Sequence, residues 1–232
     1  SVFFGKPDAN QRLPPEPLGL KKYQQRYRGG TRNVSPMFYK PEIRQAIRAK
    51  RKQMDPTAIQ QASKQAAAQL IHLPGLIESK TIAFYLPNEG ELDPYPIIQY
   101  KAWQDKQFYL PVVEVGNSKK LAYYPYHHQD PLIENRFGIQ EPSTDSKQPI
   151  DIQQLDIILL PLVSFDKHCN RIGRGAGYYD RTLAFVNENS SHKRPLLIGL
   201  GYEFQKIPEI VPAEWDVPLD MVITEKEIYQ RY

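Results

Sequence analysis

The chain has 232 residues, which is enough for one sizeable hydrophobic core. Its 41% hydrophobic content and net charge of +4 are typical of a globular protein and exclude a disordered one. The longest apolar run, Ile157–Val163, is too short to span a membrane, and the single cysteine, Cys169, excludes an intrachain disulfide. The first residues also lack the apolar stretch of a secretory signal peptide, so we expect a cytoplasmic protein without a membrane partner.

Residues 1–39 differ from the rest in charge and composition. They hold seven basic and two acidic residues, a net +5, which leaves −1 for the remainder. Prolines and glycines interrupt them and no apolar period is sustained, which predicts an irregular arm. A nucleic-acid-binding role for this basic arm is an alternative, but we expect no nucleic-acid partner because basic tails are usually only solvated. The aromatic residues of the arm favour contact of part of it with the body.

The folded domain is predicted to begin at Lys40 with two helices. Apolar positions fall on one stripe of the first helix, and Lys40, Arg44, Arg48 and Arg51 fall on an adjacent stripe. Asp55 followed by Pro56 is typical of the cap and first position of a second helix. We expect Pro74-Gly75 to end that helix.

Strands and helices then alternate to the end of the chain. The expected strands are 81–86, 108–113, 121–126, 155–165, 196–201 and 221–224, and the expected further helices are 96–104 and 178–186. The segment 155–165 is the most apolar, as expected for a central strand that is covered on both faces. This alternation predicts a single α/β domain over residues 40–232, with a largely parallel central sheet flanked by helices.

A glycine-rich segment, Arg171–Arg181, lies between the most apolar strand and a predicted helix. It contains three glycines, three arginines and one acid: Gly173, Gly175, Gly177, Arg171, Arg174, Arg181 and Asp180. Glycines let the backbone approach a ligand closely, and a loop leading into a helix start offers free N–H groups to an anion. Arginine side chains suit phosphate, and a carboxylate in this basic setting is explained by a Mg²⁺ ion. The segment therefore predicts a phosphate site.

Two common phosphate motifs do not describe this segment. No Gly-Lys-Ser/Thr follows, so it is not a Walker A loop, and its glycine spacing is not the dinucleotide-binding fingerprint. A tight turn with solvated arginines remains an alternative for the loop. Another phosphate-handling α/β enzyme, such as a sugar-phosphate isomerase-like protein, remains an alternative for the whole chain.

Five ordered motifs resemble those of the 5-formyltetrahydrofolate cyclo-ligase family, also called methenyltetrahydrofolate synthetase. Beside the glycine-rich segment these are Lys40–Arg44, Phe84–Asp93, Phe137–Pro142, Leu159–Asp166 and Asp216–Asp220 with Thr224-Glu225. The similarity extends from about Lys40 to the C-terminus and leaves residues 1–39 outside it. Ala176 stands where some relatives carry lysine.

The resemblance implies an ATP- and Mg²⁺-dependent enzyme that converts 5-formyltetrahydrofolate into 5,10-methenyltetrahydrofolate, and we expect it to be a monomer. It implies ATP binding by Lys40, Arg44, Arg171, Ile172, Gly173, Arg174, Gly175, Ala176, Gly177, Tyr178 and Tyr179. It implies folate binding by Leu86, Glu91, Arg174, Gly175, Ala176, Gly177 and Tyr178. It also implies catalytic roles for Arg174 and Tyr178, and Mg²⁺ binding by Asp180 and Asp216.

The local sequence is compatible with these roles. Lys40 and Arg44 are one helical turn apart and project from one face. Glu91 follows a strand end, where the ligands of α/β sheets bind, whereas Glu89 is expected to be a solvated loop acid. The adjacent His127 and His128 have no further ligand at metal-site spacing, so we expect them at the surface.

Overall fold

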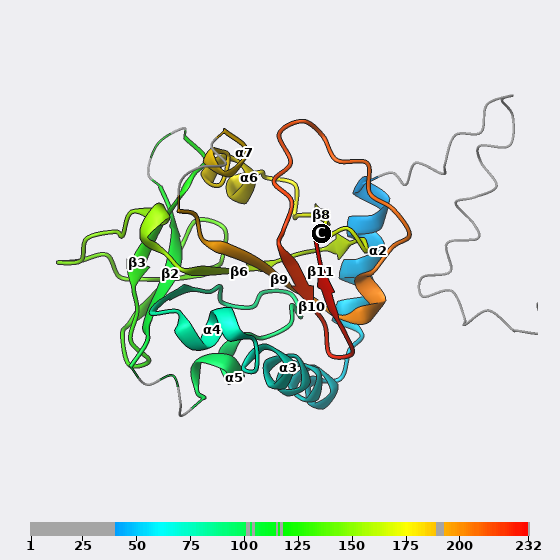
Figure 1. Ribbon diagram of the computed structural model, residues 1–232, viewed down its shortest axis with the longest axis horizontal. Coiled ribbons are helices and arrows are strands. Elements are labelled where there is room, and N and C mark those ends of the chain that lie inside the picture. Colours follow the sequence, from blue (N-terminus) through cyan, green and yellow to red (C-terminus); the bar gives the residue numbers. More distant parts are fainter. Residues whose placement is uncertain are drawn as a thin grey trace, which may run out of the picture. The chain divides into compact units, whose positions relative to one another are not determined.

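A seven-stranded sheet forms the centre of the computed structural model, which describes residues 40–100, 103, 105–114, 116, 118–188 and 193–231 (Figure 1). The strand order is β11-β10-β9-β6-β1-β2-β3. The strands are β1 (Thr81–Ala83), β2 (Gln107–Val113), β3 (Leu121–Pro125), β6 (Ile157–Pro161), β9 (Leu196–Leu200), β10 (Met221–Ile223) and β11 (Ile228–Gln230). The five inner strands are parallel, and β3 and β11 pair antiparallel at the two edges. The predicted α/β fold with a largely parallel sheet is confirmed.

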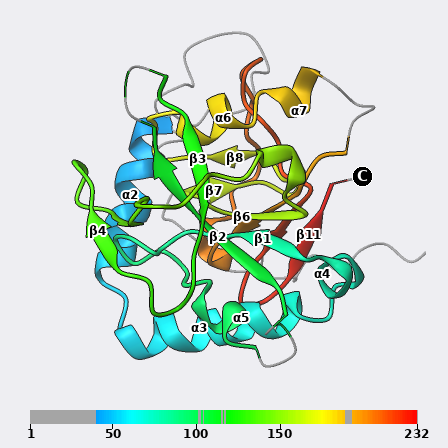
Figure 2. The ribbon, with the colours of Figure 1, turned by 90° about the vertical axis from the view of Figure 1, so that its left-hand side faces the viewer.

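Helices cover both faces of this sheet, as both views show (Figures 1 and 2). One face carries α3 (Pro56–Leu70), α4 (Pro74–Glu78) and α5 (Tyr95–Ile98), and the other carries α6 (Tyr178–Thr182) and α7 (Phe185–Glu188). Side chains of β6 alternate between two buried clusters: Ile157 and Leu159 enter one, and Ile158 and Leu160 enter the other. Burial on both faces explains why this strand is apolar at successive positions.

The helix α2 (Lys40–Lys52) lies beside the short strand β7 (Ser164–Phe165). Strand β7 pairs antiparallel with β8 (Arg171–Ile172), which leads directly into the glycine-rich segment. The first helix and the predicted phosphate loop are therefore brought together by the β7–β8 pair. A second small hairpin, β4 (Leu132–Glu134) with β5 (Gln140–Pro142), lies outside the central sheet. Two 3₁₀ turns, Ile152–Gln154 and Glu203–Gln205, complete the elements.

The structure corrects several predicted boundaries. Asp55 does cap α3, since its side chain accepts a hydrogen bond from the Thr57 N–H at 2.8 Å. However, α3 ends at Leu70, and Pro74 begins α4 instead of ending the preceding helix. This agrees with the preference for proline at a first helical position. The segment 155–165 is divided into β6 and β7, the predicted helix 178–186 is divided into α6 and α7, and α5 is only four residues long.

No helix in the described part of the chain combines the length and apolar character that a membrane span needs. The irregular arm predicted for residues 1–39 lies outside the described residues.

Candidate active site

A cavity of about 1300 Å³ opens at the carboxyl ends of the parallel strands. Residues that end or follow three neighbouring strands line it: Tyr85 and Leu86 after β1, Val113 at the end of β2, and Pro161 at the end of β6. Ligands of open α/β sheets bind at this edge, because the loops that leave the strands meet there. Every site residue predicted above from the sequence lines this one cavity.

The glycine-rich loop forms one wall of the cavity, and the backbone conformation at two of its positions favours glycine. Gly175 and Gly177 have φ values of +107° and +72°, which side-chain-bearing residues rarely adopt. A Cβ on Gly175 would lie 3.4 Å from Arg44 Cζ, and one on Gly177 would lie 2.7 Å from Arg181 Nη1. The Arg44 Nε–H also donates to the Gly173 carbonyl at 2.8 Å. The loop is therefore held directly against α2.

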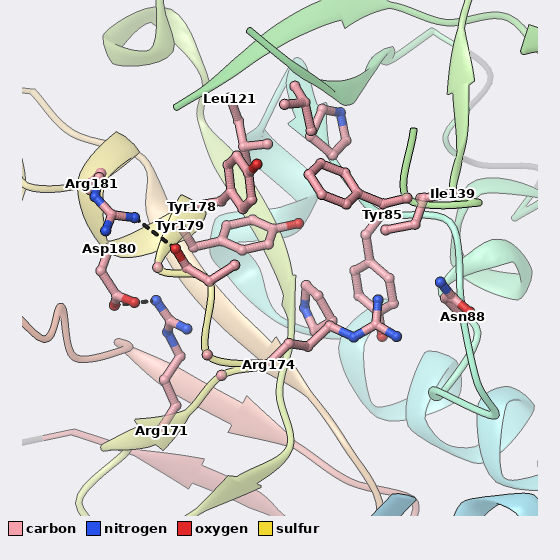
Figure 3. A pocket seen from close by; sticks show the side chains of 18 of the residues that line it. Tyr85, Asn88, Leu121, Ile139, Arg171, Arg174, Tyr178, Tyr179, Asp180 and Arg181 are labelled. Carbon is pink, nitrogen blue, oxygen red and sulfur yellow. Dashed lines mark hydrogen bonds and ion pairs between the residues drawn. The ribbon is translucent and has the colours of Figure 1, made fainter. Parts of the chain in front are cut away.

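Two ion pairs lie at the end of the cavity near α2 and α6. Lys40 Nζ donates to Asp216 Oδ2 at 2.9 Å, and Arg171 Nη2 donates to Asp180 Oδ1 at 2.6 Å (Figure 3). The N–H of Val217, the residue after Asp216, lies 3.5 Å from the same Asp180 oxygen, so the two carboxylates share one region. Each carboxylate thus neutralises a cation that was predicted to bind phosphate. Because α6 has only five residues, the positive charge here comes mainly from the side chains.

A buried carboxylate lies on another wall of the cavity. Glu91 is 4% exposed, and its Oε2 accepts a hydrogen bond from the Asn88 N–H at 3.1 Å. Its Oε1 accepts no hydrogen bond, although Arg51 Nη1 lies at 3.7 Å and Arg174 Nε at 3.8 Å. Burial raises the pKa of Glu91, and the positive charges of Arg174 and Arg51 oppose that rise. Glu91 thus places a buried carboxylate at the cavity wall, with its Oε1 within ion-pair distance of two arginines.

Arg174 extends from the glycine-rich loop toward Tyr85 and Asn88 (Figure 3). Its Nη2 donates to Glu89 Oε2 at 2.8 Å, and Arg48 Nε lies 3.3 Å from the same oxygen. Glu89, which we expected to be solvated only, therefore has two cationic partners. These partners lower the pKa of Glu89, with the Arg174 hydrogen bond as the largest cause. Arg174 is the side chain that connects the glycine-rich loop to the acidic loop.

Aromatic side chains complete the cavity. The rings of Tyr178 and Phe137 meet edge to face with centroids 6.0 Å apart, and Phe137 is half exposed near the tip of the β4–β5 hairpin. The guanidinium of Arg171 lies 5.9 Å from the centre of the Tyr179 ring. Burial raises the pKa of Tyr179, so its hydroxyl stays protonated at neutral pH. Flat apolar faces and protonated hydroxyls suit an aromatic ligand.

Sequence reasoning assigned no site role to three residues that the structure associates with the cavity. Phe137 and Trp215 line it, and Arg51 lies behind Glu91. In the sequence, Phe137 appeared only as the first residue of the motif Phe137–Pro142, with no role of its own. Trp215 is 72% exposed, and an exposed tryptophan next to Asp216 was a signal that could have been used.

The described residues hold no cluster of three or more His, Cys, Asp or Glu side chains suited to a metal ion. Asp180 and Asp216 could therefore contribute at most two protein ligands. His127 and His128 are exposed, as predicted, and His128 contacts the Tyr95 hydroxyl. Cys169 is buried, and burial raises the pKa of its thiol to about 11.

Known proteins share this fold and these motifs. The family model described as the 5-formyltetrahydrofolate cyclo-ligase family matches residues 37–225. The 5-formyltetrahydrofolate cyclo-ligase of Escherichia coli K12 is 33% identical over 184 residues, which cover 79% of this chain and 99% of that protein. The Haemophilus influenzae enzyme of the same name is 34% identical over 178 residues, which cover 77% and 93%.

Two solved structures agree with this result. The 5,10-methenyltetrahydrofolate synthetase of Aquifex aeolicus has a TM-score of 0.69 and 30% identity, covering 83% of this chain and 93% of its own. The synthetase of Mycoplasma pneumoniae, at 24% identity, has a TM-score of 0.63 over 82% of this chain and supports the fold alone. The extent of the family match and the identity to full-length relatives show that this chain belongs to the 5-formyltetrahydrofolate cyclo-ligase family.

Proposed function

We propose that this chain is an enzyme that cyclises 5-formyltetrahydrofolate to 5,10-methenyltetrahydrofolate, with ATP as co-substrate and ADP and phosphate as further products. Family membership supports the conversion of the folate. The observation that carries the finer proposal is the shared cavity: one glycine-rich loop lies between a cationic end and a buried carboxylate. A reaction that transfers a phosphoryl group from ATP to the formyl oxygen of a folate needs these two environments side by side.

The cationic end is the proposed site for ATP phosphates. Lys40 and Arg44 from α2 and Arg171 from β8 line it together with backbone groups of Gly173–Tyr179. Arginine and lysine suit phosphate oxygens because they donate several charge-assisted hydrogen bonds. Asp180 and Asp216 already pair with two of these cations, so they hold the side chains in place before the nucleotide arrives.

The same two carboxylates fit Mg²⁺, which prefers hard oxygen ligands and keeps several waters. With two protein carboxylates available, phosphate and water oxygens would complete the coordination of the ion. A bound Mg²⁺ would supply positive charge to the phosphates during transfer.

The other end of the cavity is the proposed folate site. The Glu91 carboxylate lines the cavity and would accept from the N–H donors of a pterin once Arg174 moves away, and Leu86 supplies an apolar contact. Tyr178, packed edge to face on Phe137, presents a flat surface to an aromatic ring. Arg174 and the backbone of Gly175–Gly177 lie between the two ends, where the formyl group and the γ-phosphate would meet.

In the proposed reaction the formyl oxygen attacks the γ-phosphorus, and the bond to ADP breaks. N10 of the folate then attacks the formyl carbon, whose bond to the phosphorylated oxygen breaks with phosphate as the leaving group. The proton of N10 leaves with phosphate, and the ring closes as a methenyl cation. Arg174 is placed to neutralise charge on the transferred group, and Tyr178 to position the ring.

This reaction needs no covalent intermediate with the protein. The only cysteine in the sequence, Cys169, is buried outside the cavity lining, and its raised pKa keeps the thiol protonated. Catalysis would then consist of positioning and charge neutralisation, as in other phosphoryl transfers. A monomer without nucleic-acid partner, located in the cytoplasm, stays a prediction from the sequence.

The test is to follow absorbance of the methenyl product with 5-formyltetrahydrofolate, ATP and Mg²⁺, and to omit each in turn. We expect no product without nucleotide and one ADP per product. Product formed equally well without ATP would contradict the mechanism. Binding of a sugar phosphate with no turnover of the folate would favour the isomerase-like alternative.

A further inference from the structure

Arg51, in the last turn of α2, is the most deeply buried member of the charge cluster behind the cavity. Its side chain is 2% exposed, and its Nη1 lies 3.7 Å from Glu91 Oε1. Its Nη2 donates to the carbonyl of Leu162, which follows the central strand β6. Its Nε has no hydrogen-bond partner. Burying a guanidinium is costly unless a negative charge accompanies it, so this arrangement implies an ionised Glu91.

The loop that carries Glu91 is packed directly against Arg51. Gly90 has a φ of +71°, and a Cβ there would lie 3.2 Å from both the Cβ and the carbonyl oxygen of Arg51. The Tyr202 hydroxyl donates to the Gly90 carbonyl at 3.1 Å. Within the loop, the Glu91 N–H donates to Asn88 O at 3.2 Å, and the Asn88 N–H binds Glu91 Oε2. The carboxylate is therefore fixed in direction, with Oε2 bound to the Asn88 N–H and Oε1 facing Arg51 and Arg174.

Glu91 is surrounded by titratable groups from several elements. Arg51 comes from α2 and Arg174 from the glycine-rich loop, while Glu89 adds a like charge from its own loop. Tyr85, Tyr179 and Tyr202 also interact with Glu91 electrostatically, and burial raises the pKa of all three hydroxyls, so they stay neutral near pH 7. The charged groups that oppose the effect of burial on the pKa of Glu91 are therefore Arg174 first and Arg51 second, and the hydrogen bond from the Asn88 N–H acts in the same direction.

These two arginines differ in access to the cavity. Arg174 lines it, is 28% exposed and has Glu89 as an alternative partner, whereas Arg51 lies outside the lining. Arg174 can thus turn toward a phosphoryl group, and Arg51 cannot.

We propose that Arg51 is a positioning residue, which holds Glu91 ionised and aimed into the cavity while Arg174 engages the reacting groups. Arg51 itself does not contact the substrate. This inference rests on the proposed folate site, which it deepens by naming what keeps its carboxylate charged.

The experiment measures binding of 5-formyltetrahydrofolate by calorimetry across pH, without nucleotide, for wild type, Arg51→Gln, Arg51→Lys, Glu91→Gln and the double variant Arg51→Gln/Glu91→Gln. Glutamine keeps a donor for the Leu162 carbonyl but removes the charge. Lysine keeps the charge. Glu91→Gln corrects for titration of the ligand and of other groups.

The expected sign follows from the loss of a cation beside a carboxylate. Without Arg51 the pKa of Glu91 rises further. As the pH is lowered, Glu91 is therefore protonated, and folate binding is lost, at a higher pH than in wild type. Raising the pH restores binding. We expect the midpoint for Arg51→Gln to move up by about one pH unit or more, which is about a tenfold loss of affinity below the midpoint. Arg51→Lys should keep a midpoint close to that of wild type.

Two results would overturn the inference. One is an equal loss of affinity at every pH for Arg51→Gln, which indicates a structural role alone. The other is weaker binding by the double variant than by Glu91→Gln, because a residue acting only through Glu91 has no effect once Glu91 is neutral. The double variant contains no uncompensated buried charge, so it tests the inference even if Arg51→Gln does not fold. Failure of wild type to bind the folate would instead contradict the proposed function.

Discussion

One ion pair at the proposed nucleotide end of the cavity, Lys40–Asp216, differs in exposure from the pair behind the proposed folate end, Arg51–Glu91. At the nucleotide end, the side chains of Lys40 and Asp216 are 34% and 21% exposed. At the folate end, those of Arg51 and Glu91 are 2% and 4% exposed. A partly exposed pair contributes little to stability and exchanges partners easily, whereas a buried pair is strongly destabilising when one member is removed.

This difference matches what each end is proposed to do. A phosphate group that enters the nucleotide end can replace the Asp216 carboxylate as the partner of Lys40. Water screens the charges while Lys40 changes partner. The folate end must instead hold one carboxylate, Glu91, in a fixed position in a setting with little water. A pair of one basic and one acidic side chain thus forms an exchangeable site at one end and a preorganised site at the other.

The largest effect is expected on stability, when one cation at each end of the cavity is replaced by methionine. Arg51→Met should lower the free energy of unfolding by about 3–5 kcal/mol, because it leaves a buried charge uncompensated. Lys40→Met should lower it by no more than about 1 kcal/mol, since its pair is partly solvated. Urea denaturation at pH 7 measures both values. Equal losses for the two variants would show that the pairs do not differ in the way their exposure indicates.

A large effect on catalysis is expected at Arg174, which lies between the two ends. Arg174→Lys keeps the charge but loses the planar fork that contacts Glu89. We expect kcat to fall by roughly 10²-fold, with the fold unchanged by circular dichroism. The matched control is Arg194→Lys, because Arg194 pairs with Asp220 outside the cavity lining. A normal kcat for Arg174→Lys would remove this residue from the catalytic set.

The fold and the backbone of the glycine-rich loop were predictable because their signals are local. The glycine spacing in 171–181 reflects positive φ angles in the loop, and the apolar run in 157–161 reflects burial of a strand on both faces. The structure has both features. The β4–β5 hairpin was missed because its strands are short and partly exposed, with no apolar alternation.

The role of Arg51 could not be predicted for a different reason. On the helix surface it falls on the same stripe as Arg44 and Arg48, which are partly exposed, and the segments that pack on it, the Gly90 loop and the chain at Leu162, bury it. Burial of a charge depends on contacts between segments far apart in the chain. In the sequence, Arg51 is therefore indistinguishable from the other arginines on the basic face of this helix.

A moderate effect is expected from the two carboxylates of the nucleotide end. If they hold Mg²⁺, Asp180→Asn and Asp216→Asn should each raise the Mg²⁺ concentration for half-maximal activity by about tenfold, in the range expected for weakened metal binding. Titration of Mg²⁺ at saturating ATP measures this. The control is Asp220→Asn, whose carboxylate pairs with Arg194 instead. Unchanged Mg²⁺ dependence in both site variants would show that these carboxylates only orient Lys40 and Arg171.

The smallest effect is expected from the exposed aromatic at the nucleotide end. The chain has two tryptophans: Trp103 is buried at 2% exposure, and Trp215 is 72% exposed and lines the cavity. In a Trp103→Phe variant, ATP binding should therefore change the fluorescence emission of Trp215. Binding of 5-formyltetrahydrofolate alone should change it less, because the proposed folate residues Glu91 and Leu86 lie at the other end of the cavity. Trp215→Phe, which keeps only Trp103, is the matched control and should show no response to ATP. An equal response of Trp215 to both ligands would contradict the assignment of the two ends of the cavity. The absence of any response to ATP would show that the nucleotide binds away from Trp215.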